Sequence, residues 1–265
     1  MLSLESRRAS AIEQLIRSQG GVPFVAPSMR EVPLADNPQA FEFAESLFRG
    51  EFEMIILLTG VGTRLLAATL LKHFPAQNFW ESLRSLTVVA RGSKPMAVLR
   101  EFGISAQVMV PEPNTWREIL TAIEGRPERK IAVQEYGRPA TELIEALRAR
   151  GAEVTTVPVY QWDLPFDCGP LREAVRRLAA GEFDVAMFTT SIQVPHLMRI
   201  AAEEGVEEDV RQAMKKIVIA SVGPTTSETL REFGFEPDLE PSHPKMGFLV
   251  NETAAQAAKI LQSKQ

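Results

Sequence analysis

The same pattern occurs twice in this chain at one constant spacing. Three separated stretches recur 131 positions later: 50–53 as 181–184, 99–103 as 230–234, and 9–27 as 140–158. The second match, Leu-Arg-Glu-Phe-Gly, is unchanged between the two copies. Three matches at a single offset, with no net gap, indicate an internal duplication of a half that is about 131 residues long. We therefore expect the two halves to adopt the same fold.

Each half alternates between strand-like and helix-like segments. Short continuous apolar runs, typical of strands buried on both faces of a parallel sheet, lie at 54–58, 86–90, 130–133, 154–157, 185–188 and 217–221. Helical periodicity, often followed by a glycine, is found at 9–19, 63–72, 95–102, 140–150, 171–180, 194–204, 226–233 and 252–261. This alternation predicts an α/β fold with doubly wound parallel sheets of the flavodoxin or Rossmann kind.

Two proline-bearing segments of low helical character occupy equivalent places in the two halves. They are residues 27–38 and 158–170. Two matched linkers suggest that the chain passes between domains twice. We therefore expect a discontinuous domain, 1–34 plus 164–265, and an inserted domain, 35–163. Periodicity does not distinguish this exchange from a simple tandem arrangement.

Composition narrows the class of protein. The chain has 265 residues, of which 45% are hydrophobic and 24% charged, as in ordinary soluble domains. A net charge of −5 argues against a nucleic-acid groove as the main function. The single cysteine, Cys168, permits no intramolecular disulfide. The start lacks a signal-peptide pattern, and the longest apolar stretch, 54–58, is too short for a bilayer, so a cytoplasmic protein without membrane contact is expected.

Several cofactor and metal motifs are incomplete. Gly60 and Gly62 follow a predicted strand as in a dinucleotide fingerprint, but Leu65 stands where the third glycine belongs. The three histidines, His73, His196 and His243, lack ligand spacing. The sequence therefore predicts neither a bound cofactor nor a metal.

Four motifs, in their order along the chain, resemble the uroporphyrinogen-III synthase family. They are Ser6-Arg7-Arg8, Val157-Pro158-Val159-Tyr160, Phe188-Thr189-Thr190-Ser191, and Ala220-Ser221-Val222-Gly223-Pro224-Thr225-Thr226. The resemblance covers essentially the whole chain, and the Gly-Pro-Thr-Thr segment is its most specific part. In the first half, 59–62 and 91–94 depart from the motifs, and the short first strand ahead of Arg7 suggests a natural start further upstream.

The resemblance implies a bilobal protein whose two α/β domains are joined by a two-stranded hinge. It also implies a substrate, hydroxymethylbilane, held in the cleft between the lobes. The family's reaction closes this linear tetrapyrrole with loss of water and inversion of ring D, without a metal or cofactor. A monomer that makes transient contact with the upstream deaminase is the family expectation.

Turns that follow the predicted strands supply the candidate substrate-binding residues. Helix N-termini present unpaired N–H groups and partial positive charge, which suits a substrate with eight carboxylates. The candidates are Thr59, Gly60, Thr190, Ser191, Gly223, Pro224, Thr225 and Thr226, with Arg7 at the end of the first strand. The simpler alternatives are an ordinary N-cap for the threonines and a surface ion pair for Arg7.

Tyr160 is the candidate catalytic residue, and Lys245 lies in a loop that could border the same region. The Tyr160 phenol could donate a hydrogen bond or a proton to the departing hydroxyl. Its alternative is a hinge tyrosine with a packed ring and a solvated hydroxyl.

Two other functions compete with the enzyme. One is a non-catalytic ligand-binding or regulatory module of the same family, and the other is a periplasmic-type hinge binding protein. The missing export signal counts against the second. The first would usually carry a DNA-binding element, for which the single helix 252–261 at the end leaves no room.

Overall fold

The computed structural model describes residues 1–34, 38–135, 137 and 139–264, and the chain separates into two compact units. Unit 1 consists of Met1–Arg30 and Asp163–Gln265, and unit 2 of Glu31–Trp162. The domain limits expected from the sequence, 1–34 with 164–265 and 35–163, stay a prediction.

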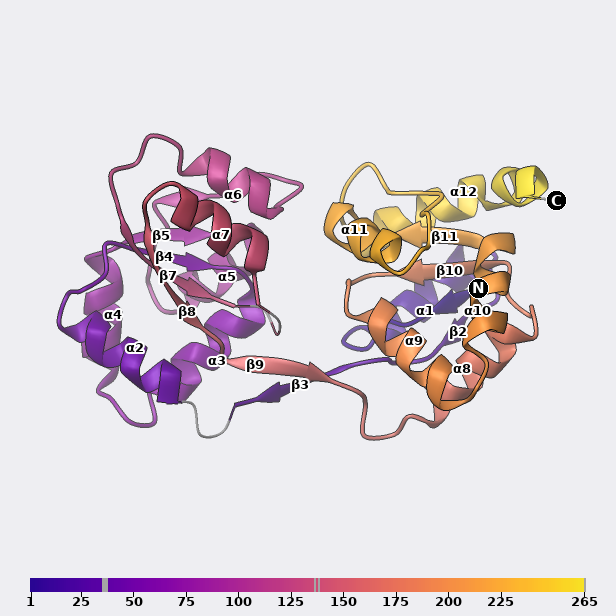
Figure 1. The fold of residues 1–265 in the computed structure, drawn as a ribbon, viewed down its shortest axis with the longest axis horizontal. Coiled ribbons are helices and arrows are strands. Elements are labelled where there is room, and N and C mark those ends of the chain that lie inside the picture. The colour runs from indigo at the N-terminus through magenta and orange to yellow at the C-terminus, as the bar shows by residue number, and fades with distance from the viewer. Residues whose placement is uncertain (35–37, 136, 138, 265) are drawn as a thin grey trace. The chain divides into compact units, whose positions relative to one another are not determined.

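Unit 2 is built on a five-stranded parallel sheet with the order β6-β5-β4-β7-β8 (Figure 1). Its strands are β4 (Met54–Leu57), β5 (Thr87–Ala90), β6 (Val108–Met109), β7 (Lys130–Gln134) and β8 (Glu153–Val157). The central strand β4 is buried along its whole length, as its run of Met, Ile, Ile and Leu requires of a strand covered on both faces.

Helices cover both faces of this sheet. One face packs against α2 (Pro38–Phe48), α3 (Gly60–Leu70), α4 (Ala76–Arg84) and α5 (Ser93–Glu101). The other face packs against α6 (Trp116–Ala122) and α7 (Thr141–Ala149). The side chains of β4 alternate between the two faces of the sheet. Ile55 and Leu57 pack in the core with α2 to α5, and Met54 and Ile56 pack in the core with α6 and α7.

Unit 1 repeats the arrangement with a four-stranded sheet of order β11-β10-β1-β2. Its strands are β1 (Leu2–Ser3), β2 (Phe24–Val25), β10 (Val185–Phe188) and β11 (Val218–Ser221), all paired in parallel. One face packs against α8 (Gly169–Ala179), α9 (Gln193–Glu203), α10 (Glu207–Lys216) and α11 (Pro224–Glu232). The other packs against α1 (Ala9–Ser18) and α12 (Met246–Lys264).

The two sheets confirm the internal duplication. Strand β10 begins 131 residues after β4, and β11 begins 131 residues after β5. The parallel bridge between Ala220 and Leu239 also lies 131 residues after the pairing of Val89 with Val108. The predicted fold class, two doubly wound parallel-sheet units, is therefore confirmed.

The chain passes between the units through a small two-stranded sheet, β3 (Arg30–Pro33) with β9 (Tyr160–Asp163), which confirms the predicted hinge. At the unit 1 end of this ladder, Arg30 Nη2 pairs with Asp163 Oδ2 at 2.6 Å and Arg30 Nε donates to the Leu164 carbonyl at 2.9 Å. The Arg30 guanidinium also lies 4.0 Å from the centre of the Phe166 ring.

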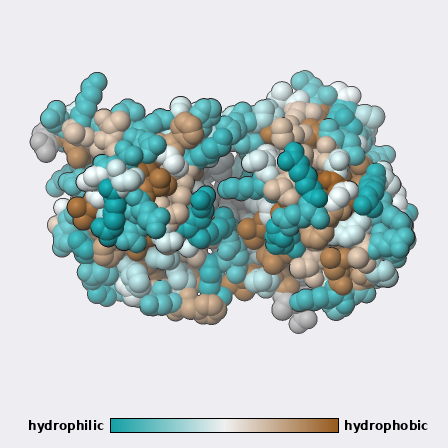
Figure 2. Space-filling view, turned by 180° about the vertical axis from the view of Figure 1, so that it is seen from behind, coloured by the Kyte–Doolittle hydropathy of each residue, from teal (hydrophilic) through white to brown (hydrophobic). Residues whose placement is uncertain are grey.

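The surface in Figure 2 is mainly hydrophilic, with apolar residues scattered over it. Among the large apolar side chains that are exposed are Val22, Met109, Phe166 and Phe248. Of the described helices, none combines the length and the apolar character that a membrane crossing needs.

Candidate active site

The carboxyl end of β4 in unit 2 brings three of the predicted residues together. Thr59 follows this strand and caps α3, because its Oγ1 accepts the Gly62 N–H at 3.0 Å. The Tyr160 hydroxyl lies 3.4 Å from the same Thr59 oxygen. Gly60 begins α3, and a β-carbon there would lie 2.9 Å from the Lys94 carbonyl oxygen of α5. A glycine is thus needed for the close approach of α3 to α5.

Tyr160 is almost completely enclosed. The residue is 2% exposed and belongs to the core of unit 2. Its ring lies edge-on to Trp162, with 6.3 Å between the ring centroids. The backbone of Gly137, at a φ of 85°, passes so close that a β-carbon there would lie 2.9 Å from Tyr160 Cε2. The hydroxyl, rather than the ring, therefore reaches the strand end.

A buried glutamine that the sequence reasoning missed completes this turn. Gln134 is the last residue of β7 and is 0% exposed. Its Oε1 accepts the Thr59 N–H at 3.4 Å, and its Nε2 donates to the Glu135 carbonyl. The only hint in the sequence is a polar residue that ends an apolar strand, and that pattern usually indicates an exposed position.

The turn after β10 in unit 1 holds Thr190 and Ser191 in the same relation to a strand and a helix. Gln193, also 0% exposed, accepts the N–H groups of Thr189 at 2.7 Å and Thr190 at 3.3 Å. Its Nε2 donates to Thr189 Oγ1 at 3.0 Å, and the Thr189 hydroxyl donates to a Glu5 carboxylate oxygen. The Thr190 N–H, which the sequence suggested as a carboxylate donor, is therefore already engaged.

The turn after β11 carries the Gly-Pro-Thr-Thr segment. Gly223 caps α11 and Pro224 is the first helical residue, so Thr225 lies in the first turn. The N–H groups of Thr226 and Ser227 both donate to the Gly223 carbonyl, at 3.0 and 3.1 Å. The Thr225 N–H meets no acceptor among the described residues, so it is the donor that this turn leaves open.

Backbone hydrogen bonds hold neighbouring turns together at this edge of each sheet. In unit 1 the Val222 N–H donates to the Phe188 carbonyl at 2.9 Å, and in unit 2 the Arg91 N–H donates to the Leu57 carbonyl at 3.0 Å. These two bonds join equivalent residues of the duplicated halves. In each unit, this bond holds the turn after one strand against the last residue of the neighbouring strand.

The two predicted cations lie near these turns in unit 1. Arg7 is exposed and follows β1, and the neighbouring Ser6 Oγ accepts the N–H groups of Ser28 and Met29 at 3.0 Å each. Lys245 is exposed and follows Pro244, whose Cβ would be 3.3 Å from a β-carbon on Gly223. The loop that carries Lys245 therefore lies beside the α11 turn.

Two buried titratable groups show shifted pKa values. Burial raises the pKa of Glu135, which is 8% exposed and accepts the Ala140 N–H at 3.4 Å. Burial lowers the pKa of His196, which is 7% exposed and whose Nδ1 lies 2.7 Å from the Ser28 carbonyl oxygen. From the sequence, His196 is one of three histidines without metal-ligand spacing, and nothing there points to Glu135.

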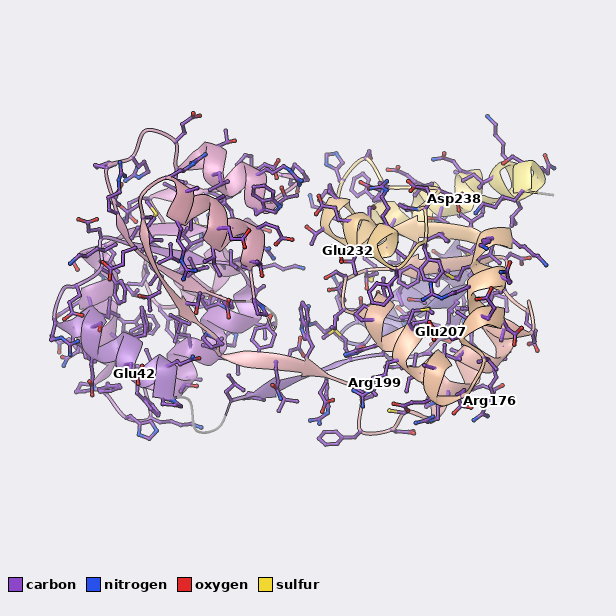
Figure 3. All side chains as sticks on the ribbon, viewed as in Figure 1. Glu42, Arg176, Arg199, Glu207, Glu232 and Asp238 are labelled. Atoms are coloured by element: carbon purple, nitrogen blue, oxygen red, sulfur yellow. The ribbon has the colours of Figure 1, made fainter. Side chains whose placement is uncertain are left out.

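Many charged side chains pair with each other on the outer helices. Arg176 on α8 pairs with Glu204 at 2.7 Å, and Arg199 on α9 pairs with Glu203 at 3.1 Å. Figure 3 labels the two arginines. These exposed pairs contribute little to stability. Among the described residues, His, Cys, Asp and Glu form no group of three that could hold a metal ion.

A pocket of about 350 Å³ in unit 2 lies at the opposite end of the sheet from these turns. Its walls include Met54 and Ile131 near the starts of β4 and β7, together with Arg126, Arg129 and Arg150. None of the residues predicted for the site lines this pocket.

Comparison with known proteins identifies a family to which the sequence is similar. Residues 10–251 match the family model described as Uroporphyrinogen-III synthase HemD. The uncharacterized protein YjjA of Bacillus subtilis is 29% identical over 94% of this chain and 92% of its own length. A Methanothermobacter thermautotrophicus protein, provisionally named as a uroporphyrinogen-III synthase, is 28% identical over 86% of each chain.

A solved structure supports the fold. A mutant uroporphyrinogen III synthase of Thermus thermophilus matches with a TM-score of 0.71 and 24% identity, covering 100% of this chain and 98% of that chain. At this level of identity the likeness concerns the fold alone. The family model, in contrast, spans most of the sequence, from the first helix of unit 1 to its last. The chain belongs to the uroporphyrinogen-III synthase family.

Proposed function

We propose that the chain is a uroporphyrinogen-III synthase, which closes hydroxymethylbilane into uroporphyrinogen III with loss of water and inversion of ring D. The family match over residues 10–251 is the observation that carries this proposal. The arrangement of polar groups at the strand ends of both units is consistent with it.

The reaction demands conformational control more than a reactive side chain. Loss of the hydroxyl from ring A leaves an electrophilic carbon, which must meet the substituted carbon of ring D rather than its free end. Bond formation at the substituted carbon gives a spiro intermediate that fragments and recloses with ring D inverted. Holding a flexible chain so that one carbon reaches and another does not is catalysis by orientation.

Backbone N–H groups are the proposed binding elements for the carboxylate arms. In unit 2 the N–H groups of Gly60 and Val61 meet no acceptor among the described residues, and in unit 1 those of Ser191, Ile192 and Thr225 likewise meet none. Such groups at helix N-termini favour anions through their hydrogen bonds and the helix dipole. This explains how a protein with a net charge of −5 can bind a polyanion. The hydroxyls of Thr190, Thr225 and Thr226 belong to the same turns.

The pair formed by Thr59 and Tyr160 is the proposed donor to the departing hydroxyl. The Tyr160 ring is enclosed, and its hydroxyl contacts Thr59 Oγ1 at 3.4 Å. A phenol held in this way acts on the substrate through the Thr59 hydroxyl, which lies at the strand end. Arg7 is the proposed cation for a propionate arm, and Lys245 is a second candidate beside the α11 turn.

A coupled assay tests the proposal. Porphobilinogen and its deaminase supply hydroxymethylbilane, and the products are oxidised and separated into isomers I and III with and without this protein. We expect isomer III to predominate when the protein is present. A product mixture that remains isomer I would refute the synthase and favour a non-catalytic ligand-binding module.

A further inference from the structure

Each unit places one fully buried glutamine beside a threonine in the turn after a strand, Thr59 after β4 and Thr190 after β10. In unit 2, Gln134 Oε1 accepts the Thr59 N–H at 3.4 Å. In unit 1, Gln193 Oε1 accepts the Thr190 N–H at 3.3 Å. Thr59 and Thr190 are equivalent residues of the duplication, 131 positions apart, and both glutamines are 0% exposed. An amide oxygen therefore faces the equivalent threonine N–H in both units, at a distance that is long for an N–H···O hydrogen bond. In unit 1 the same Gln193 oxygen also accepts the Thr189 N–H at 2.7 Å.

The two glutamines reach this place from different elements. Gln134 comes from β7, the strand next to β4, whereas Gln193 is the first residue of α9. The position equivalent to Gln193 in unit 2 is Gly62, in the first turn of α3. A β-carbon on Gly62 would lie 2.5 Å from Gln134 Cδ, so a side chain at Gly62 would require the Gln134 amide to leave its position. Each unit therefore has one amide beside the threonine, which comes from strand β7 in unit 2 and from helix α9 in unit 1.

Burying a glutamine amide lowers the stability of the folded protein unless hydrogen bonds compensate for it. A carboxamide buried in an apolar core loses its hydration, and only hydrogen bonds compensate for that loss. An apolar side chain would fill the same volume without this requirement. The amide acceptor is nevertheless present in both units, although the element that supplies it differs. The common result is the fixed position of the threonine N–H.

We propose that this buried glutamine is a positioning residue for substrate binding, acting through the strand-end threonine. The inference rests on the proposed function and extends it to Gln134 and Gln193. By engaging the threonine N–H, the amide fixes the direction of the threonine side chain and leaves the next two N–H groups of the turn for a carboxylate. In unit 2 it thereby also sets Thr59 Oγ1 against the Tyr160 hydroxyl.

The duplicated halves suggest a test in which the amide is moved. The variant Gln134→Ala removes the amide, Gly62→Gln adds a second one where there is no room, and the double variant transfers it to the helix as in unit 1. Gln77→Ala, at an exposed glutamine of α4, serves as the matched control. Each protein is assayed for kcat, KM and the ratio of isomers III and I, and its thermal unfolding is followed.

We expect Gln134→Ala to remain folded and to lose about 10- to 100-fold in kcat/KM, because misplaced binding groups cost this much. The ratio of isomer III to isomer I should fall as well, which a loss of stability alone would not cause. The double variant should recover to within about 3-fold of the wild type. If Gly62→Gln fails to fold alone, Gln193→Ala in unit 1 provides the second single variant, with the same loss expected.

Full activity of folded Gln134→Ala would overturn the inference, and so would a folded double variant no more active than Gln134→Ala. These outcomes are distinct from a failure of the proposed function. A wild-type protein that produces no isomer III refutes the proposed function before any variant is made. If the wild type is active and the glutamine variants have the same activity, only the role of the glutamine is refuted.

Discussion

Replacement of Tyr160 by Phe removes one hydroxyl and leaves the enclosed ring in place. The hydroxyl lies 3.4 Å from Thr59 Oγ1, which is long for an O–H···O hydrogen bond. A typical hydrogen bond contributes about 0.5–1.5 kcal/mol net, so this one contributes about 0.5 kcal/mol. Thr59 keeps its bond from the Gly62 N–H at 3.0 Å. We therefore expect the melting temperature to fall by only about 1–2 °C.

The effect on turnover should be much larger. Loss of a positioned proton donor typically lowers the rate about 100- to 10,000-fold, which corresponds to roughly 3–5 kcal/mol in the barrier. The coupled isomer assay measures the rate, and thermal unfolding of the same preparation measures stability. A folded Phe variant with unaltered production of isomer III would show that the Tyr160 hydroxyl has no part in the chemistry.

Three further changes address other groups. Thr225→Ala removes the hydroxyl and keeps the backbone N–H, so it should weaken substrate binding about 10-fold, as expected for one hydrogen bond to a charged group, while the melting temperature changes little; a KM equal to that of the wild type would show that the Thr225 hydroxyl does not bind the substrate. Since burial raises the pKa of Glu135, its ionised form is disfavoured in the folded protein, and stability from this group falls as pH rises above about 4.5. Glu135→Gln should therefore increase the free energy of unfolding in urea at pH 7 but not at pH 4, and equal gains at both values would refute the argument. Burial lowers the pKa of His196, so stability should fall as pH drops below about 6.5, by at most about 1.4 kcal/mol per pH unit. His196→Gln should flatten this slope between pH 7.5 and 5.5, and an unchanged slope would assign it to other groups.

The repeat in the sequence predicted the architecture because duplication constrains both halves together. The strands at 54–58 and 185–188 were recognisable, since a strand covered on both faces must be continuously apolar. The helices α2, α4, α6 and α10 were not predicted. Helix α10 is largely charged, with only Val210, Ala213 and Met214 buried, so its apolar face is too narrow to stand out.

The candidate site could be predicted only in part. The threonines were identifiable because a hydroxyl residue between a strand and a helix is a recognised cap. Gln134 was missed because its partner Thr59 lies 75 residues away in the sequence. The partners of Gln193 are only three and four residues away, but a polar residue at the start of a helix is usually exposed, so nothing in the sequence indicated that Gln193 is buried. The sequence also could not show that the Thr190 N–H is bonded to Gln193, because this contact depends on the direction in which the Gln193 side chain points.

Hydrogen exchange of the backbone amides, with and without the product uroporphyrinogen III under anaerobic conditions, tests the central claim most directly. Binding at the strand ends should slow exchange at residues 59–62 in unit 2 and at 190–193 and 222–226 in unit 1. Protection confined to residues 123–131, around the pocket at the other end of the unit 2 sheet, would contradict the claim, and so would the absence of protection in all of these segments.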